Sequence, residues 1–181
     1  MTASRIHPSA FIAPSAMVMG EVEVGEESSI WYTSVLRGDM APIRIGSQTN
    51  LQDGTIVHVD EGVPCTIGNR VGVGHRVILH GCTVEDECLI GMGSILLNGV
   101  VIGRGSLVAA GAVVLEGQRV PPGSLVMGLP GRVIRPVTAE LTRRIEATWR
   151  HYVAQAKRHR SGAFPLVKGG DHAERPSSAT R

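Results

Sequence analysis

The sequence contains very few aromatic residues. Phenylalanine, tyrosine and tryptophan together make up 3% of its 181 residues, whereas 43% are hydrophobic and 23 are glycine. A core must therefore be filled by Val, Ile, Leu and small side chains, which favours a regular repeat over an irregularly packed interior. A chain of this length has room for one substantial core, so we expect a single domain.

Cysteine and excess charge are also scarce. Cys65, Cys82 and Cys88 form no C-x-x-C pair, which argues against a disulfide framework and against a thiolate zinc site. A net charge of +2 gives no broad basic surface for nucleic acid. No apolar run approaches the roughly 18 residues that span a bilayer, and the first residues do not read as a secretion signal. We therefore expect a soluble, cytoplasmic protein that binds neither nucleic acid nor membranes.

An aliphatic residue recurs at every sixth position along most of the chain. Eight successive occurrences run from Val84 to Val126, and the same spacing continues upstream with three interruptions. A small or β-branched residue follows four positions later in most repeats. A hexapeptide period is typical of a parallel β-helix, in which three hexapeptides make one triangular coil and the coils stack. The predicted fold class is an all-β solenoid, a parallel β-helix of six to seven coils.

The period changes after the last repeat, and an α-helix is predicted there. Leu141, Ile145, Trp149 and Tyr152 fall on one helical face behind Thr138, which is a suitable N-cap. We expect this helix to pack on the solenoid.

These patterns divide the chain into three segments. Residues 1–136 are expected to form the β-helix domain and residues 137–160 the C-terminal helix. Residues 161–181 are polar and rich in Gly, Pro and Ser, so a flexible tail is expected.

Polar residues lie at each of the three interruptions in the six-residue spacing. The motif RGD (37–39) opens the first interruption, His58 lies at the second and HGC (80–82) fills the third. Insertions in a β-helix are pushed outward at its corners, so these polar groups can reach the surface without disturbing the core.

Counting hexapeptides places two of the histidines in one column. If each interruption counts as one longer unit, Arg37, His58 and His80 lie on the same corner in three successive coils. Adjacent strands are roughly 4.8 Å apart. Two imidazoles at that separation can converge on one metal ion, at nitrogen-to-metal distances of about 2.0–2.1 Å.

A second column holds the third histidine. Asp53 and His75 are one coil apart on a different edge of the triangle, with Gln52 beside them. His75 can hardly reach the first column within its own subunit, but a neighbouring copy could supply it, and Arg37 would then lie level with Asp53 for a charged contact. Such contacts close into a ring, and a triangular prism closes naturally at three. The prediction is a homotrimer with three metal sites at its subunit junctions.

The motifs RGD, NLQD with a histidine five residues after the Asp, and HRVILHGC together resemble those of the gamma-class carbonic anhydrase family. The resemblance covers about residues 8–160, and the hexapeptide-repeat relatives imply a left-handed β-helix. The family's functional residues carry over as follows: His58, His75 and His80 as metal ligands, Gln52 as the group that orients the metal-bound water, Asn50 as a nearby polar lining group, Arg37, Asp39 and Asp53 as interface ion pairs, and Tyr152 as a tyrosine brought towards the metal.

The resemblance implies a lyase that hydrates CO2 to bicarbonate. Three neutral ligands leave Zn2+ its full charge, so bound water ionises with a pKa of about 7 instead of about 15.7, and the hydroxide can attack CO2. Fe2+ or Co2+ would also suit three imidazoles. The best-equipped members of the family have more acidic groups here than the loop 59–65 provides, and Met40 follows Asp39. Asp60 and Glu61 are the nearby carboxylates for proton export.

Two other functions are compatible with the same pattern. Relatives of this family hydrolyse acyl-CoA thioesters, and other hexapeptide-repeat proteins are CoA-dependent acyltransferases. A transferase needs one histidine that acts as a base, so three converging histidines argue against this activity. The trimer could also be a low-activity structural or assembly subunit.

Overall fold

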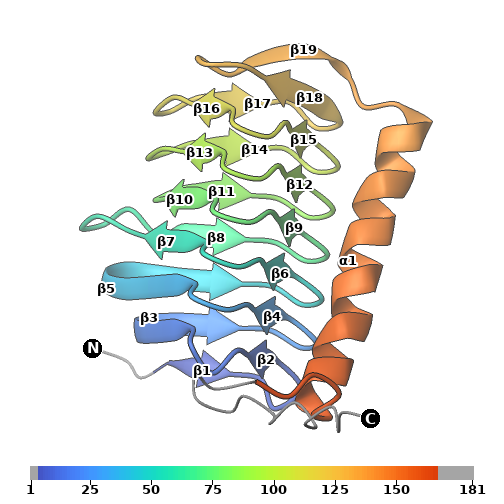
Figure 1. Cartoon of the computed structure of the whole chain (residues 1–181). Helices are drawn as coiled ribbons and strands as arrows, with labels where there is room; N and C mark the ends of the chain where they lie inside the picture. Colours follow the sequence, from blue (N-terminus) through green and yellow to red (C-terminus); the bar gives the residue numbers. More distant parts are fainter. Residues whose placement is uncertain (1–3, 167–181) are drawn as a thin grey trace, which may run out of the picture.

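The computed structural model describes residues 4–166. The chain forms a parallel β-helix with one long helix along its side (Figure 1). The strands are β1 (Arg5–Ile6), β2 (Phe11–Ile12), β3 (Met17–Val24), β4 (Ser29–Ile30), β5 (Val35–Ile45), β6 (Asn50–Leu51), β7 (Ile56–His58), β8 (Cys65–Ile67), β9 (Gly72–Val73), β10 (Ile78–His80), β11 (Thr83–Val84), β12 (Leu89–Ile90), β13 (Ile95–Leu96), β14 (Val101–Ile102), β15 (Leu107–Val108), β16 (Val113–Val114), β17 (Arg119–Val120), β18 (Ser124–Met127) and β19 (Arg132–Pro136). The helix α1 spans Ala139–Arg160.

The strands stack into three faces, as a triangular prism requires. The helix face consists of β2, β4, β6, β9, β12, β15 and β18, closed by the antiparallel β19. The open face consists of the first half of β3 and β5, then β7, β10, β13 and β16. The polar face consists of β1, the second half of β3 and β5, and β8, β11, β14 and β17. Seven parallel strands on the helix face correspond to about seven coils, which confirms the predicted solenoid.

The recurring aliphatic residues fill the interior. Val57, Leu79 and Leu96 are fully buried and lie directly above one another in the parallel register of β7, β10 and β13. Burying each such side chain contributes about 1.5–3 kcal/mol. Most of the small residues four positions later are buried too, and Thr49 donates its hydroxyl to the Gly68 carbonyl at 2.7 Å. Cys88 is one of these small buried residues, as predicted.

The first interruption differs from the expected outward loop. β5 remains extended through the corner and thereby joins the open and polar faces into one sheet of 11 strands. It can do so because β3 follows the same path beneath it, with Gly20 paired to Gly38. A Cβ on Gly20, whose φ is +83°, would lie 2.2 Å from the Gly38 carbonyl oxygen. The second interruption is a turn in which Asp60 and Val63 form an isolated bridge.

The predicted C-terminal helix is present and covers the helix face (Figure 1). Its N-cap is Thr138, whose side chain accepts a hydrogen bond from the Leu141 amide. Ile145 is buried against Leu107 and Leu125 of the helix face.

The described structure includes only the beginning of the predicted tail. Residues 161–166 follow the helix, and the remainder of the predicted flexible tail, 167–181, lies outside the described residues.

Among residues 4–166 no helix has the length and apolar character needed to cross a bilayer.

Candidate metal centre

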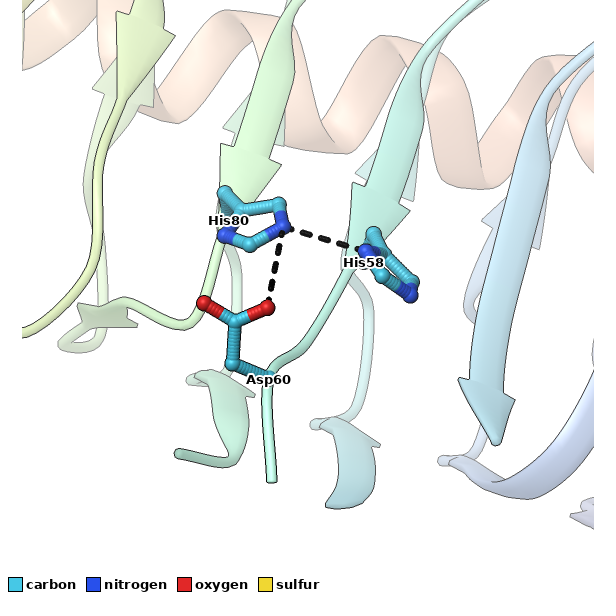
Figure 2. A group of neighbouring side chains, drawn as sticks. All are labelled: His58, Asp60 and His80. Carbon is cyan, nitrogen blue, oxygen red and sulfur yellow. Dashed lines mark hydrogen bonds and ion pairs between the residues drawn. The ribbon is translucent and has the colours of Figure 1, made fainter. Parts of the chain in front are cut away.

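The first predicted column exists. The parallel register of β5, β7 and β10 aligns Arg37 with His58 and His58 with His80. The two histidines lie at the ends of their strands with their rings turned towards each other, and His58 Nδ1 is 3.0 Å from His80 Nε2 (Figure 2). The hexapeptide count thus located the pair correctly, because every strand on this face is paired in register with the next.

Asp60 completes a group of three potential metal ligands with these histidines. It is the one such group that the described residues contain, and the Asp60 carboxylate lies 4.0 Å from His80 Nε2 (Figure 2). Asp60 comes from the turn after β7, so its position depends on the path of that turn. The sequence indicated it only as a carboxylate near the site.

The second predicted column also exists, on another edge of the prism. His75 Nδ1 is 2.9 Å from Asp53 Oδ2, and the Tyr152 hydroxyl of α1 lies 3.4 Å from His75 Nε2. A carboxylate can only accept a hydrogen bond, so the proton of a neutral His75 is on Nδ1 and its lone pair is on Nε2. His75 does not belong to the ligand group around His58 and His80.

The donor atoms of the first column fit a metal ion. His58 Nε2 lies 3.2 Å from Asp39 Oδ1, and His80 Nδ1 lies 2.8 Å from Asn98 Oδ1. Both partners offer oxygen acceptors, which place the protons on the outer nitrogens. Two lone pairs then face each other across 3.0 Å, an arrangement that favours a cation between them.

Arg37 pairs within its own chain. Its guanidinium contacts the Asp39 carboxylate, and this hydrogen bond lowers the pKa of Asp39. Asp39 therefore stays ionised and can accept from His58. The interface pairing of Arg37 with Asp53 stays a prediction.

Gln52 and Asn50 are both buried and form one amide chain. Gln52 Nε2 donates to Asn50 Oδ1 at 3.1 Å, and Asn50 Nδ2 donates to the Val71 carbonyl at 3.4 Å. The Gln52 Nε2 atom is therefore engaged with Asn50. Gln52 and His75 line one cavity of about 440 Å³ between α1 and the helix face, together with Tyr152.

Tyr152 is held in its protonated form. Partial burial raises the pKa of its phenol, and the nearby Asp53 carboxylate raises it further. The hydroxyl is thus a hydrogen-bond donor at neutral pH, directed at the lone pair of His75. Asp53 thereby influences both partners of this contact.

Asn98 is a residue of the site that the sequence motifs did not indicate. It lies two residues after Leu96, in the coil after His80, at a place where the six-residue spacing is uninterrupted. The sequence offered one signal, a polar residue beside the position where the histidine column would continue into the next coil. Its side chain also donates to Asp60 Oδ2 at 2.7 Å.

Comparisons with known proteins agree with this architecture. The family model described as bacterial transferase hexapeptide (six repeats) matches residues 81–116. The carbonic anhydrase of Geobacillus kaustophilus is 44% identical over 172 residues, which cover 95% of this chain and 94% of that protein. Gamma carbonic anhydrase 1 of Arabidopsis thaliana mitochondria is 45% identical over 164 residues, covering 87% of this chain.

The chain spans only part of some relatives. It covers 60% of the length of that Arabidopsis protein and 56% of gamma carbonic anhydrase 2 from the same plant. Among solved structures, the BC4754 gene product of Bacillus cereus has a TM-score of 0.86 and 43% identity, covering 87% of this chain and 92% of that one. The left-handed form of the β-helix is thereby confirmed.

Proposed function

The chain belongs to the gamma carbonic anhydrase family, and on this premise we propose that it hydrates CO2 to bicarbonate at metal sites shared between the subunits of a homotrimer. The observation that carries the proposal is the separation of the three histidines. His58 and His80 present facing lone pairs on one edge, whereas His75 presents its lone pair on another. A neighbouring copy is the natural source of the third ligand.

The outward side chains of the open face support such contacts. An apolar ladder runs beside the histidine column, in the parallel register of the strands. Its members are Met17, Val35, Ile56, Ile78, Ile95 and Val113. Met17, Ile56 and Ile78 are 55%, 38% and 37% exposed. A continuous exposed apolar strip of this kind marks a surface that another protein covers.

Zn2+ is the metal that we propose for the site. Three neutral imidazoles suit it, although Fe2+ and Co2+ accept the same ligands. A bound metal ion of this kind supplies Lewis acidity that brings the pKa of water to about 7. His58, His80 and the neighbour's equivalent of His75 would hold it. Asp60 is the alternative third ligand within one chain.

Gln52 is proposed to orient the attacking water. Because its Nε2 donates to Asn50, its Oε1 is the atom left to accept a hydrogen bond from water in the cavity beside His75. If Gln52 Oε1 accepts a hydrogen bond from the water, a lone pair of the water oxygen would be directed towards CO2. Tyr152 would act beside it as the donor that restrains His75 until the subunits assemble.

Mixing inactive subunits tests the shared site. Subunits carrying His58→Ala lack the first column and subunits carrying His75→Ala lack the second, so neither homotrimer has a complete site. After unfolding and joint refolding, every hybrid trimer has one junction between two intact columns. We expect such hybrids to regain up to one metal ion per trimer and part of the CO2 hydration rate.

A matched control uses two variants of the same column. In mixtures of His58→Ala and His80→Ala subunits, every junction lacks one of the two histidines of the first column. These mixtures should regain neither metal nor activity. If hybrids of His58→Ala and His75→Ala, verified by mass spectrometry, also stay metal-free, the shared site is wrong.

Hydrolysis of acyl-CoA thioesters is a second candidate. The cavity beside Gln52 and His75 is large enough for a short acyl group and has apolar lining residues such as Leu89, Leu107 and Val108. Purified metal-loaded protein should be assayed with CO2 and with acyl-CoAs of increasing chain length. Turnover of an acyl-CoA without CO2 hydration would favour this second function.

A further inference from the structure

We propose that Asp60 and Asn98 act together as positioning residues for His80. Asp60 orients the side-chain amide of Asn98, and the amide holds His80 in the tautomer that can bind a metal ion. This inference rests on the proposed metal site. It gives Asp60 a role other than the proton export considered above.

The three histidines differ in the group that faces their outer nitrogen. His58 and His75 face the carboxylates of Asp39 and Asp53, at 3.2 Å and 2.9 Å. An ionised carboxylate can only accept a hydrogen bond. These two imidazoles therefore take the metal-binding tautomer without further control.

His80 faces a side-chain amide, which is ambiguous. An amide accepts through its oxygen and donates through its nitrogen. In the structure Asn98 Oδ1 lies 2.8 Å from His80 Nδ1. If the amide were rotated by half a turn, its nitrogen would donate to Nδ1, the proton would sit on Nε2, and no lone pair would face His58.

Asp60 decides between these two orientations. Asn98 Nδ2 donates to Asp60 Oδ2 at 2.7 Å, and the rotated amide would place an oxygen against that carboxylate. The turn keeps Asp60 in place, because the Val63 amide donates to the Asp60 carbonyl at 3.0 Å. Gly81 leaves the necessary space: a Cβ there would lie 2.3 Å from Asn98 Oδ1 and 2.7 Å from Val63 Cγ1.

The contacts of Asp60 favour positioning over ligation. Its carboxylate is 4.0 Å from His80 Nε2, whereas His58 Nδ1 is 3.0 Å from that atom. The second carboxylate oxygen is engaged by Asn98. Half of the Asp60 side chain is exposed, so its substitution can be tolerated by the fold.

The decisive measurement is the tautomer of His80 in the metal-free protein. Histidine labelled with ¹⁵N reports by NMR which ring nitrogen carries the proton, at a pH well above the ordinary histidine pKa of about 6.5. The wild type should carry it on Nδ1. Asp60→Ala and Asn98→Leu should each move a measurable fraction to Nε2. The conservative Asp60→Glu, which keeps an acceptor-only carboxylate, should leave the proton on Nδ1.

Glu61→Ala is the matched control, because it removes the neighbouring exposed carboxylate of the same turn. It should leave the tautomer unchanged. Zn2+ affinity, measured by competition with a chelator, should fall about 10–100-fold in Asp60→Ala and in Asn98→Leu. The double variant should be no worse than either single variant, since both act through one amide.

An unchanged tautomer in Asp60→Ala would overturn the proposal. If that variant also lost Zn2+ affinity, Asp60 would be a ligand. Should Asn98→Leu fail to fold, Asp60→Ala alone decides. Because the tautomer is read without metal, a protein that binds Zn2+ but does not hydrate CO2 would refute the proposed function and leave this inference standing.

Discussion

The helix face and the open face both carry apolar side chains on their outer surface. On the helix face, Phe11, Leu107 and Leu125 point outward and are only 6–7% exposed because α1 covers them. On the open face, Ile56 and Ile78 occupy the equivalent outward positions and are more than a third exposed. The two faces have similar chemistry, and the chain itself covers one of them.

The third face shows that an uncovered face of this β-helix can be polar. Its outward positions include Arg44, Thr66, Thr83 and Arg119. The apolar character of the open face is therefore a property of that face and not of the repeat. Because the first histidine column lies at its edge, the trimer that we propose would cover the open face and bring His75 of a neighbour to the proposed metal site.

The largest effect is expected from charges on the open face. Ile56→Glu combined with Ile78→Glu would bring unpaired carboxylates into each subunit junction, which costs several kcal/mol per buried charge. The proposed trimer should dissociate, and light scattering should give the mass of one 19.2 kDa chain. Thr66→Glu with Thr83→Glu on the polar face is the control and should stay trimeric. A trimeric open-face variant would contradict the assignment of this surface.

A buried truncation on the helix face should act differently. Ile145→Ala removes packing against Leu107 and Leu125 and should lower the free energy of unfolding by about 2–5 kcal/mol while leaving the trimer intact. Urea denaturation measures the change. Arg143→Ala, on an exposed position of α1, should stay within about 0.5 kcal/mol of wild type. Loss of the proposed trimer in Ile145→Ala would contradict the assignment of assembly to the open face alone.

Metal removal should destabilise the protein only where both columns are intact. A ligand at 100 times its dissociation constant stabilises the folded state by about 2.7 kcal/mol. A chelator should therefore lower the thermal unfolding temperature of the wild type and leave that of His75→Ala unchanged. An equal decrease in His75→Ala would show that His58, His80 and Asp60 suffice within one chain.

The smallest effect is expected from an ion pair that fastens α1 to the coils. Lys157 Nζ lies 2.6 Å from Glu27 Oε1, and its hydrogen bond lowers the pKa of the Glu27 carboxyl below the ordinary 4.5. The pair thus stabilises the protein above pH 4.5, and this contribution is lost as the pH falls through the lowered pKa. Lys157→Met should reduce the free energy of unfolding by less than about 1 kcal/mol at pH 7.

Denaturation at two pH values separates this effect from lost packing. The difference between Lys157→Met and wild type should disappear well below the folded pKa of Glu27. A difference that persists in acid would point to the aliphatic part of Lys157 instead.

Much of the candidate site could be predicted because its residues lie on coils that repeat at a regular spacing in the sequence. In a stack of parallel strands the core permits no slip of register, since a shift by one residue would turn Val57 or Leu79 outward. Counting hexapeptides therefore gave both the coil in which a residue lies and the edge of the prism that it occupies. It placed His58 with His80 and Asp53 with His75 correctly.

The sequence by itself determined the β-helix, its C-terminal helix and the two histidine columns, because repeats and register are properties of the order of residues. Only the tertiary structure decided that Asp60 and Asn98 meet beside His80, and that α1 covers one apolar face and leaves the other open. Those contacts depend on the path of a turn, the rotation of an amide and the docking of a helix. None of these repeats every six residues.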